Sequence, residues 1–547
     1  MRSPRARNPK AKSEHESPNG IPQVWPAQIR ARPGPGLWLP HGLVTIAISE
    51  LASEFISSYD MAGMNGVLSR GPTVAGVRVK PSKISLVKPM TPTEDHWLNL
   101  SNLDRVVNPT FSSIIHFFEN PPADMMEHMR SSLSQVLVDF YPLAGRLEVR
   151  MDGVVDLHCN DGGAIFIEAA VDVTLAGAGG AQPMWSISGM DIAKIGPGPL
   201  YVPDQEQPMP VLIVMVTEFK CGAIAVATNW HHTVADGFSG THFMKSWAEV
   251  AQGLEISIRP DHNRAQLKPR SPLNPTLVNG YTAKPLMDLP SPTAKRAVRQ
   301  PALLNAFHLA REAATELKTR ANVQPPPFTP GRSFTTAESI SAHLWIQMTK
   351  ARMANADSPR TADSPRTVES DHYRLEHPVG HATTRFFIFV DGRKKLGLKP
   401  GYFGNVVCSA CAMATEEEIA HGSIHLAASH IRTATRNITG EYFRSLIDWV
   451  EEQGVCGLAA AKSEHVNSMG HDVAATFWTF FPLYEIKFAG ENKPVFAARN
   501  SPPRPLIDGI AMMPGTDGPG SMVALLNLHS DRMSKLQRQL SFMTVFQ

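Results

Sequence analysis

The sequence is poor in cysteine and almost balanced in charge. Its five cysteines (Cys159, Cys221, Cys408, Cys411 and Cys456) are too few and too scattered among 547 residues for a disulfide framework. We therefore expect a reducing compartment and, by default, the cytoplasm. The Cys-x-x-Cys at 408–411 has no second pair or neighbouring histidine, which favours two strand residues over a zinc site. A net charge of +2 gives no field that would attract nucleic acid or a membrane surface.

Long apolar runs and several catalytic signatures are also missing. Residues 37–56 are fairly apolar, but Pro40, His41, Glu50 and Glu54 interrupt them, which excludes a membrane span there. The Gly-x-Ser-x-Gly turn of a serine hydrolase is absent, as are a glycine loop for phosphates and a cluster of metal ligands. We therefore expect no metal and no permanently bound cofactor.

What is present describes a globular protein with an unusual N-terminus. A hydrophobic content of 43% and a charged content of 19% are typical of folded soluble chains. Residues 1–35 are rich in arginine and proline and read as disordered. We treat residues 1–75 as a disordered or mispredicted extension. The remaining chain is predicted to form an N-terminal domain at 76–265, a proline-rich crossover at 266–303 and a C-terminal domain at 304–547.

The most informative stretch is His232-Thr233-Val234-Ala235-Asp236-Gly237. Apolar runs at 211–216 and 223–230, separated by a turn at 220–222, predict a β-hairpin in front of it. Apolar residues at helical spacing from Phe238 to Val250 predict a helix that begins near Gly237. His232 is thus placed between a strand and a helix, where a group that titrates near neutral pH can act as a base.

The motif is weak when taken alone. The chain has 21 histidines, and a single one is more often structural or solvated than catalytic. His-x-x-x-Asp also occurs by chance in many proteins. Other parts of the chain must therefore support the interpretation.

Patterns elsewhere predict a mixed α/β protein. Apolar spacing predicts helices at 126–140 and 424–438, a third that leads through Trp345, and a strand at 386–390. Strands and helices follow one another without regular alternation, which favours open mixed sheets over a barrel.

Six short motifs stand out between about Val79 and the C-terminus. They are residues 97–104 (WLNLSNLD), 141–146 (YPLAGR), 231–237 (HHTVADG), 390–393 (VDGR), 401–405 (GYFGN) and 481–486 (FPLYEI). Each is short, but together, in this order and spacing, they resemble the plant BAHD acyl-CoA-dependent acyltransferases, and within them the hydroxycinnamoyl-CoA transferases.

The resemblance implies a fold and a mechanism. The fold would be α/β, with two pseudo-symmetric chloramphenicol-acetyltransferase-like domains, mixed sheets and a channel between them. His232 would be the general base that activates an alcohol or amine for attack on the thioester of acyl-CoA, the co-substrate. The protein would work as a monomer in plant specialised (phenylpropanoid) metabolism, with small molecules as its only partners.

The resemblance also assigns supporting roles. Asp236 would support the loop by pairing with an arginine, and Arg393 resembles the structural arginine of the family. Ser339, Tyr402 and Asn405 resemble residues that line the coenzyme A side.

One departure from the family concerns its second signature, Asp-Phe-Gly-Trp-Gly followed by a basic residue and proline. The corresponding run at 487–494 reads KFAGENKP, which keeps only Phe488 and the final Lys493-Pro494. Lys487 replaces the acid, and the indole thought to help stabilise the oxyanion is missing. Loss of an oxyanion donor typically costs about 100- to 1000-fold in rate. We therefore expect an impaired or specialised enzyme, or one that holds the oxyanion with Thr479 or with backbone amides.

The acceptor is left open by the sequence. Thr476 and Trp478 match members that acylate shikimate, and Lys462 would replace the arginine that grips the acceptor carboxylate or would simply be solvated. The run at 480–485 is more similar to members that acylate amines. An alternative of another class is a catalytically silent paralogue that binds a small molecule or a partner.

Overall fold

The computed structural model describes residues 79–107, 109–151, 154–176, 208–278, 281–283, 302–324, 332–356, 382–454, 461–463, 472–499, 508–540 and 544–545. The expected extension at 1–75, Cys456, most of the crossover at 266–303 and the side chain of Lys462 lie outside the described residues.

The first large sheet is mixed and has six strands in the order β1-β6-β8-β9-β3-β16. β6 and β8 are parallel, and the other neighbours are antiparallel. The neighbouring strands β9 and β3 are buried along their whole length. The strands are β1 (Val79–Val87), β3 (Phe111–Phe118), β6 (Ala164–Val171), β8 (Leu212–Phe219), β9 (Ile224–His231) and β16 (Phe496–Arg499).

The second large sheet is also mixed and has seven strands in the order β13-β12-β15-β17-β18-β11-β19. β15 is parallel to both of its neighbours. Its strands are β11 (Ala302–Leu309), β12 (Thr383–Asp391), β13 (Val407–Thr415), β15 (Asp472–Phe477), β17 (Asp508–Pro514), β18 (Met522–His529) and β19 (Thr544–Val545). Cys408 and Cys411 lie in β13, as strand residues.

Two small sheets complete the strands. One contains β2 (His96–Leu98), β5 (Val155–Cys159), β4 (Arg146–Val149) and β7 (Met209–Pro210), and the other pairs β10 (Tyr281–Ala283) with β14 (Ala461–Ser463).

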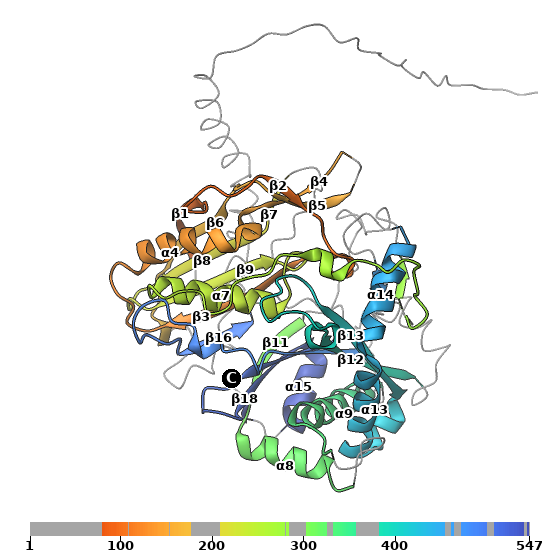
Figure 1. Ribbon diagram of the computed structural model, residues 1–547. Coiled ribbons are helices and arrows are strands. Elements are labelled where there is room, and N and C mark those ends of the chain that lie inside the picture. The colour runs from red at the N-terminus through yellow and green to blue at the C-terminus, as the bar shows by residue number, and fades with distance from the viewer. Residues whose placement is uncertain are drawn as a thin grey trace, which may run out of the picture. The chain divides into compact units, whose positions relative to one another are not determined.

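The helices cover the large sheets (Figure 1). Near the first sheet, α4 and α7 contact each other, and Trp247 Nε1 donates to Ser132 Oγ at 3.0 Å. Near the second sheet, α9 contacts α8, α13 and α15, and its Trp345 is fully buried. The helices are α3 (Asn102–Arg105), α4 (Met125–Asp139), α7 (Gly237–Ala251), α8 (Arg311–Ala321), α9 (Thr336–Ala356), α11 (Arg393–Leu396), α12 (Glu416–His421), α13 (Ile424–Asn437), α14 (Gly440–Glu452) and α15 (Ser530–Gln539), with 3₁₀ turns η1 (Tyr141–Ala144), η3 (Arg264–Leu267) and η5 (Leu483–Glu485).

The two halves of the chain are joined through β16. This strand comes from the C-terminal half but pairs with β3 in the first sheet, where Arg499 lies opposite Ile114. This exchange could not be predicted from the sequence, because three apolar residues and an arginine carry no information about their partner strand. The expected α/β class with mixed sheets is confirmed, as are the hairpin β8–β9 and the helix α7 that follows it. In the described ranges, no helix is long and apolar enough to cross a membrane.

Candidate active site

Two adjacent histidines follow each other at the end of β9, but only one keeps exposed surface. His231 is 1% exposed, and burial lowers its pKa to about 3. His232 is partly exposed, and its backbone N–H donates to the Thr110 carbonyl at 2.8 Å. Of the two, His232 is therefore the residue that a substrate can reach.

Asn405 fixes the tautomer of His232. The Asn405 Nδ2 group donates to the carbonyls of His232 (2.7 Å) and Thr233 (3.1 Å) and to Asp104 Oδ1 (2.9 Å). Because three acceptor oxygens surround this side-chain atom, it must be the amide nitrogen. Oδ1 is then the atom that faces His232 Nδ1 at 3.1 Å. Because Oδ1 can only accept, Nδ1 carries the proton, and Nε2 keeps its lone pair.

The protonation state of His232 suits a base. Burial lowers its pKa from the ordinary value of 6.5; the charge of Asp236 acts in the opposite direction, and that of Arg499 lowers the pKa further. At neutral pH the ring is therefore neutral and can accept a proton at Nε2.

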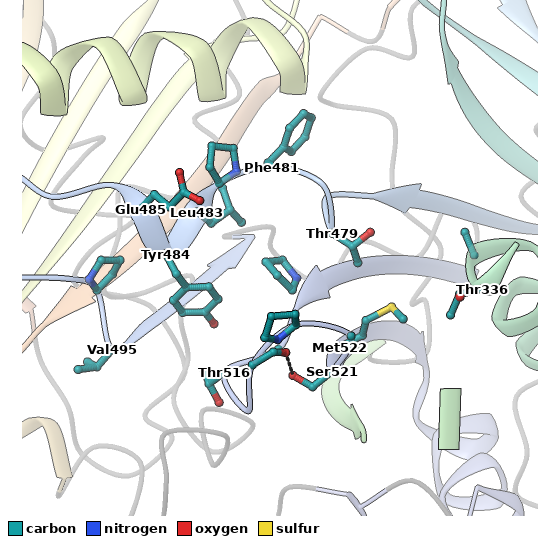
Figure 2. Close-up of a pocket in the computed structure, with 18 residues that line it drawn as sticks. Thr336, Thr479, Phe481, Leu483, Tyr484, Glu485, Val495, Thr516, Ser521 and Met522 are labelled. Carbon is teal, nitrogen blue, oxygen red and sulfur yellow. Dashed lines mark hydrogen bonds between the residues drawn. The ribbon is translucent and has the colours of Figure 1, made fainter. Parts of the chain in front are cut away.

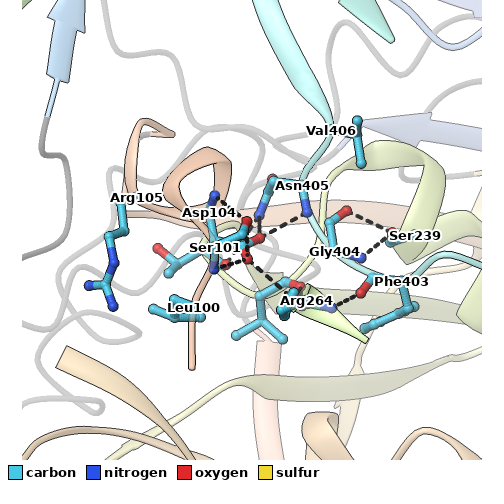
Figure 3. A network of polar contacts seen from close by, with 12 residues as sticks. Leu100, Ser101, Asp104, Arg105, Ser239, Arg264, Phe403, Gly404, Asn405 and Val406 are labelled. Carbon is cyan, nitrogen blue, oxygen red and sulfur yellow. Dashed lines mark hydrogen bonds and ion pairs between the residues drawn. The ribbon is translucent and has the colours of Figure 1, made fainter. Parts of the chain in front are cut away.

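Asp104 holds Asn405 in place (Figure 3). Its Oδ1 accepts both the backbone N–H and the side-chain amide of Asn405, each at 2.9 Å. Its Oδ2 accepts from Arg264 Nε at 3.0 Å and from the N–H and Oγ of Ser101, the N-cap of α3. Arg264 also donates to the carbonyls of Val234 and Phe403. Asp104 has no exposed surface, so its negative charge is stabilised entirely by these donors.

Asp236 forms a second buried anchor. It caps α7 by accepting from the Ser239 N–H at 2.9 Å, and it also accepts from the Val406 N–H at 3.0 Å. Its two oxygens pair with Arg393 at 2.9 and 3.0 Å. Burial alone would raise the pKa of Asp236, but Arg393 and the two amides outweigh it and hold the pKa below 3.8. Asp236 is thus a charged support of the loop. Among the described residues, its carboxylate forms no hydrogen bond with the His232 ring.

The two anchors hold the turn at 401–406 against the loop at 232–236, and Gly404 permits the close approach. A Cβ on Gly404 would lie 2.7 Å from the guanidinium carbon of Arg264. The Gly404 N–H donates to Ser239 Oγ, and its carbonyl accepts from Ser239 and Arg393. A larger residue here would push Asn405 away from His232.

Trp478 lies against the start of α7. It is 4% exposed, and its ring is 3.3 Å from the position that a Cβ on Gly237 would occupy. Its indole also approaches Trp230, with centroids 6.4 Å apart, and the ring of Phe481. Thr476 is partly exposed in β15, two residues earlier.

A cavity of about 520 Å³ borders the segment after Trp478 (Figure 2). Thr479 and Phe481 line one wall, Thr336 and Ala337 at the start of α9 line another, and the β17–β18 turn lines a third. Phe481 also contacts Trp478 and the Gly237 position, so this wall adjoins the end of the loop at 232–236.

The residues expected to line the coenzyme A side are buried. Ser339, Tyr402 and Asn405 all have no exposed surface, and Ser339 Oγ donates back to the Thr335 carbonyl. Their expected contact with coenzyme A therefore stays a prediction. Asn405 contacts His232, and Thr336 and Ala337, near Ser339, line the cavity.

The altered signature at 487–494 serves packing. Phe488 has no exposed surface and meets Phe118 and Trp247 edge to face. Gln252 Nε2 donates to the Lys487 carbonyl at 2.9 Å. The Lys487 ammonium pairs only with Glu491, at 2.5 Å, within the same segment.

A sequence profile described as the Transferase family matches residues 77–543. The chain belongs to this family. The BAHD resemblance noted from the motifs is thereby confirmed, and the protein is an acyl-CoA-dependent acyltransferase.

Named relatives of this BAHD transferase extend over most of its chain. It is 30% identical to Hydroxycinnamoyltransferase 2 of Oryza sativa subsp. japonica, over 83% of this chain and 98% of the relative. It is 28% identical to hydroxycinnamoyl-CoA:5-hydroxyanthranilate N-hydroxycinnamoyltransferase HHT4 of Avena sativa (83% and 97%). It is 26% identical to shikimate O-hydroxycinnamoyltransferase of Nicotiana tabacum (84% and 99%).

Solved structures show the same fold. Vinorine synthase superposes with a TM-score of 0.61 at 20% identity, covering 85% of this chain and 98% of that one. TRI101 of F. graminearum, complexed with coenzyme A and deoxynivalenol, gives 0.65 at 15% identity, covering 83% and 100%.

Two parts of the site were missed from the sequence. The roles of Asp104 and Arg264 depend on contacts to Asn405 and to each other over separations of 301 and 160 residues. One local signal was available, since Ser101 and Asp104 have the spacing of a capping box. The second missed part is Arg499 next to Trp478, for which no sequence motif indicated a place in the site.

Proposed function

We propose that the protein transfers an acyl group, hydroxycinnamoyl by preference, from acyl-CoA to an alcohol or amine, with His232 as the general base. The observation that carries the proposal is the contact of His232 Nδ1 with Asn405 Oδ1, which assigns the proton to Nδ1 and leaves Nε2 to accept a proton. The names of the relatives support the donor.

The proposed reaction balances in two steps. The acceptor O–H or N–H loses its proton to His232 Nε2 as its oxygen or nitrogen bonds to the thioester carbon. The tetrahedral oxyanion then collapses, the C–S bond breaks, and the coenzyme A thiolate takes the proton from the imidazolium. Asp236 has no part in proton transfer in this scheme, because Arg393 and two amides occupy its oxygens.

We assign stabilisation of the oxyanion to Thr479 or to backbone amides near it. Thr479 is partly exposed and lines the cavity beside Phe481. The segment 487–494 is a poorer candidate, because Phe488 is packed in the core and Gly490, Glu491 and Lys493 are exposed.

The acceptor remains to be determined by experiment. Relatives named for shikimate O-acylation and for 5-hydroxyanthranilate N-acylation match at similar identity, so they favour neither ester nor amide products. The expected contribution of Lys462 stays a prediction. The division at 266–303 is part of the proposal as well, with β16 crossing back to the first sheet.

Turnover with p-coumaroyl-CoA tests the function. Purified protein would be incubated with shikimate, 5-hydroxyanthranilate, putrescine and tryptamine, and coenzyme A release would be followed. We expect His232→Ala to lower the rate about 100- to 10,000-fold, the contribution of a positioned base. His421→Ala, an exposed histidine at the end of α12, is the matched control. Coenzyme A release no faster than in His232→Ala would instead support the silent paralogue.

A further inference from the structure

Arg499, at the end of β16 and near the candidate base, is a cation without an anionic partner among the described residues. Its guanidinium carbon lies 5.9 Å from the centroid of the Trp478 ring. Its Nε is buried and makes no hydrogen bond. No carboxylate of the described residues pairs with it, although Arg264 and Arg393 each have a buried aspartate.

The position of Arg499 places it on the same side of the sheet as the tryptophans of the site. Arg499 lies opposite Ile114, which lies opposite Thr228, and opposed residues of antiparallel strands present their side chains on one face. Thr228 shares that face with Trp230, two residues further along β9, and Trp230 approaches Trp478. The charge of Arg499 also lowers the pKa of His232, which places the guanidinium within electrostatic reach of the ring.

An unpaired guanidinium in such a place is unfavourable for the free protein. Burial lowers the pKa of Arg499, and nothing in its surroundings acts in the opposite direction. The positive charge of Arg499 also makes His232 a weaker base. Both effects would be offset by an anion that arrives with a ligand, since a carboxylate pairs with the planar fork of arginine through two hydrogen bonds.

We propose that Arg499 binds a carboxylate of the acceptor, so that the acceptor is a hydroxy acid or an amino acid. The proposal rests on the function above, because it concerns the acceptor of the same reaction. The bound carboxylate lies beside the Trp478 ring and directs the hydroxyl or amine of the acceptor toward His232 Nε2. Arg499 acts here as a specificity residue, and the proton is still taken by His232.

The test compares acids with their neutral esters. The probes are shikimate with methyl shikimate, and 5-hydroxyanthranilate with its methyl ester, each with p-coumaroyl-CoA. We expect Arg499→Met to lower the ratio of kcat/KM for acid over ester by about 10- to 100-fold, the range for loss of a charged hydrogen bond. Arg499→Lys should restore part of the ratio, since it keeps a point charge. Lys318→Met, an exposed cation on α8, should leave the ratio unchanged.

Two further readouts keep the result decisive. The acid limb of the kcat/KM profile should move to higher pH in Arg499→Met, because the charge that lowers the pKa of His232 is gone. Calorimetric binding of each acid and ester to His232→Ala protein, with and without Arg499→Met, measures recognition without turnover. If the unmodified protein shows no turnover but binds the acid in a way that depends on Arg499, the proposed function is rejected and this subsite is kept. An unchanged acid-to-ester ratio in folded Arg499→Met and Arg499→Lys, or an effect confined to the KM for p-coumaroyl-CoA, would overturn the subsite.

Discussion

The loop at 232–236 and the segment 487–494 both correspond to family signatures, but they are held in different ways. Around His232, buried charges fix the backbone, since Asp104 pairs with Arg264 and Asp236 pairs with Arg393. At 487–494 the only ion pair among the described residues is Lys487–Glu491, whose glutamate is 88% exposed. That segment is held by the buried ring of Phe488 and by hydrogen bonds from the side chains of His128 and Gln252 to its backbone carbonyls.

The difference explains which part of the second signature survives. A buried aromatic side chain loses much packing when it is replaced, so Phe488 is retained. The charge of Lys487, which is partly buried, pairs with the exposed Glu491, and such a pair contributes little, so its sign can change without loss of the fold. The charge reversal at Lys487 therefore affects only its own segment, whereas a change at Asp104 would alter the position of Asn405 and so of His232.

The largest effect should come from Asp104→Ala. It leaves Arg264 buried without its partner and frees Asn405, so we expect a loss of about 3–5 kcal/mol in the free energy of unfolding, together with a fall in kcat/KM. Chemical denaturation measures the free energy of unfolding, and coenzyme A release measures kcat/KM. Asp172→Asn, which removes the exposed partner of Lys220, should change neither. Equal behaviour of the two variants would contradict the anchoring role.

Phe488→Ala should be nearly as destabilising, but for a different reason. Removing a fully buried ring between Phe118 and Trp247 should cost about 3–5 kcal/mol in the free energy of unfolding. If the segment serves packing, kcat of the remaining folded protein should change far less than its stability. A selective loss of kcat with intact stability would show that the segment acts on the reaction.

Asn405→Ala should weaken the base more than the fold. Without Oδ1 the His232 ring can exchange tautomers, and we expect a fall in kcat/KM of about 10- to 100-fold, part of the effect of a positioned base. The readout is the kcat/KM profile against pH, compared with that of His232→Ala. A profile and rate equal to those of the unmodified protein would exclude the positioning role.

The smallest effect should follow from changing the charge in the altered signature. Lys487→Met removes only its contact with Glu491, so the unfolding midpoint and kcat should match those of the unmodified protein. Grafting the family run Asp-Phe-Gly-Trp-Gly in place of residues 487–492 should likewise give no large gain in kcat, if Thr479 or nearby amides hold the oxyanion. A gain of about 100-fold or more would instead assign that role to the missing indole.

Local patterns predicted the elements well, because they depend on neighbours in sequence. Apolar runs predicted β8 and β9, and helical spacing predicted α7 and α13. The motifs placed His232 at the strand end, where it lies. The roles of Asn405, Asp104 and Arg499 depended on contacts between distant segments, which no local pattern encodes. The expected coenzyme A contacts of Ser339, Tyr402 and Asn405 came from a motif match alone, and their burial could not be foreseen from it.

The central claim is that His232 is neutral, carries its proton on Nδ1 and offers Nε2 to the acceptor. Nitrogen-15 NMR of histidine-labelled protein, with the signal assigned by its loss in His232→Ala, reports this directly. The account predicts a neutral ring at pH 7 with the proton on Nδ1, which becomes protonated only below pH 6.5 because burial lowers its pKa. A proton on Nε2, or a charged ring at pH 7, would contradict it.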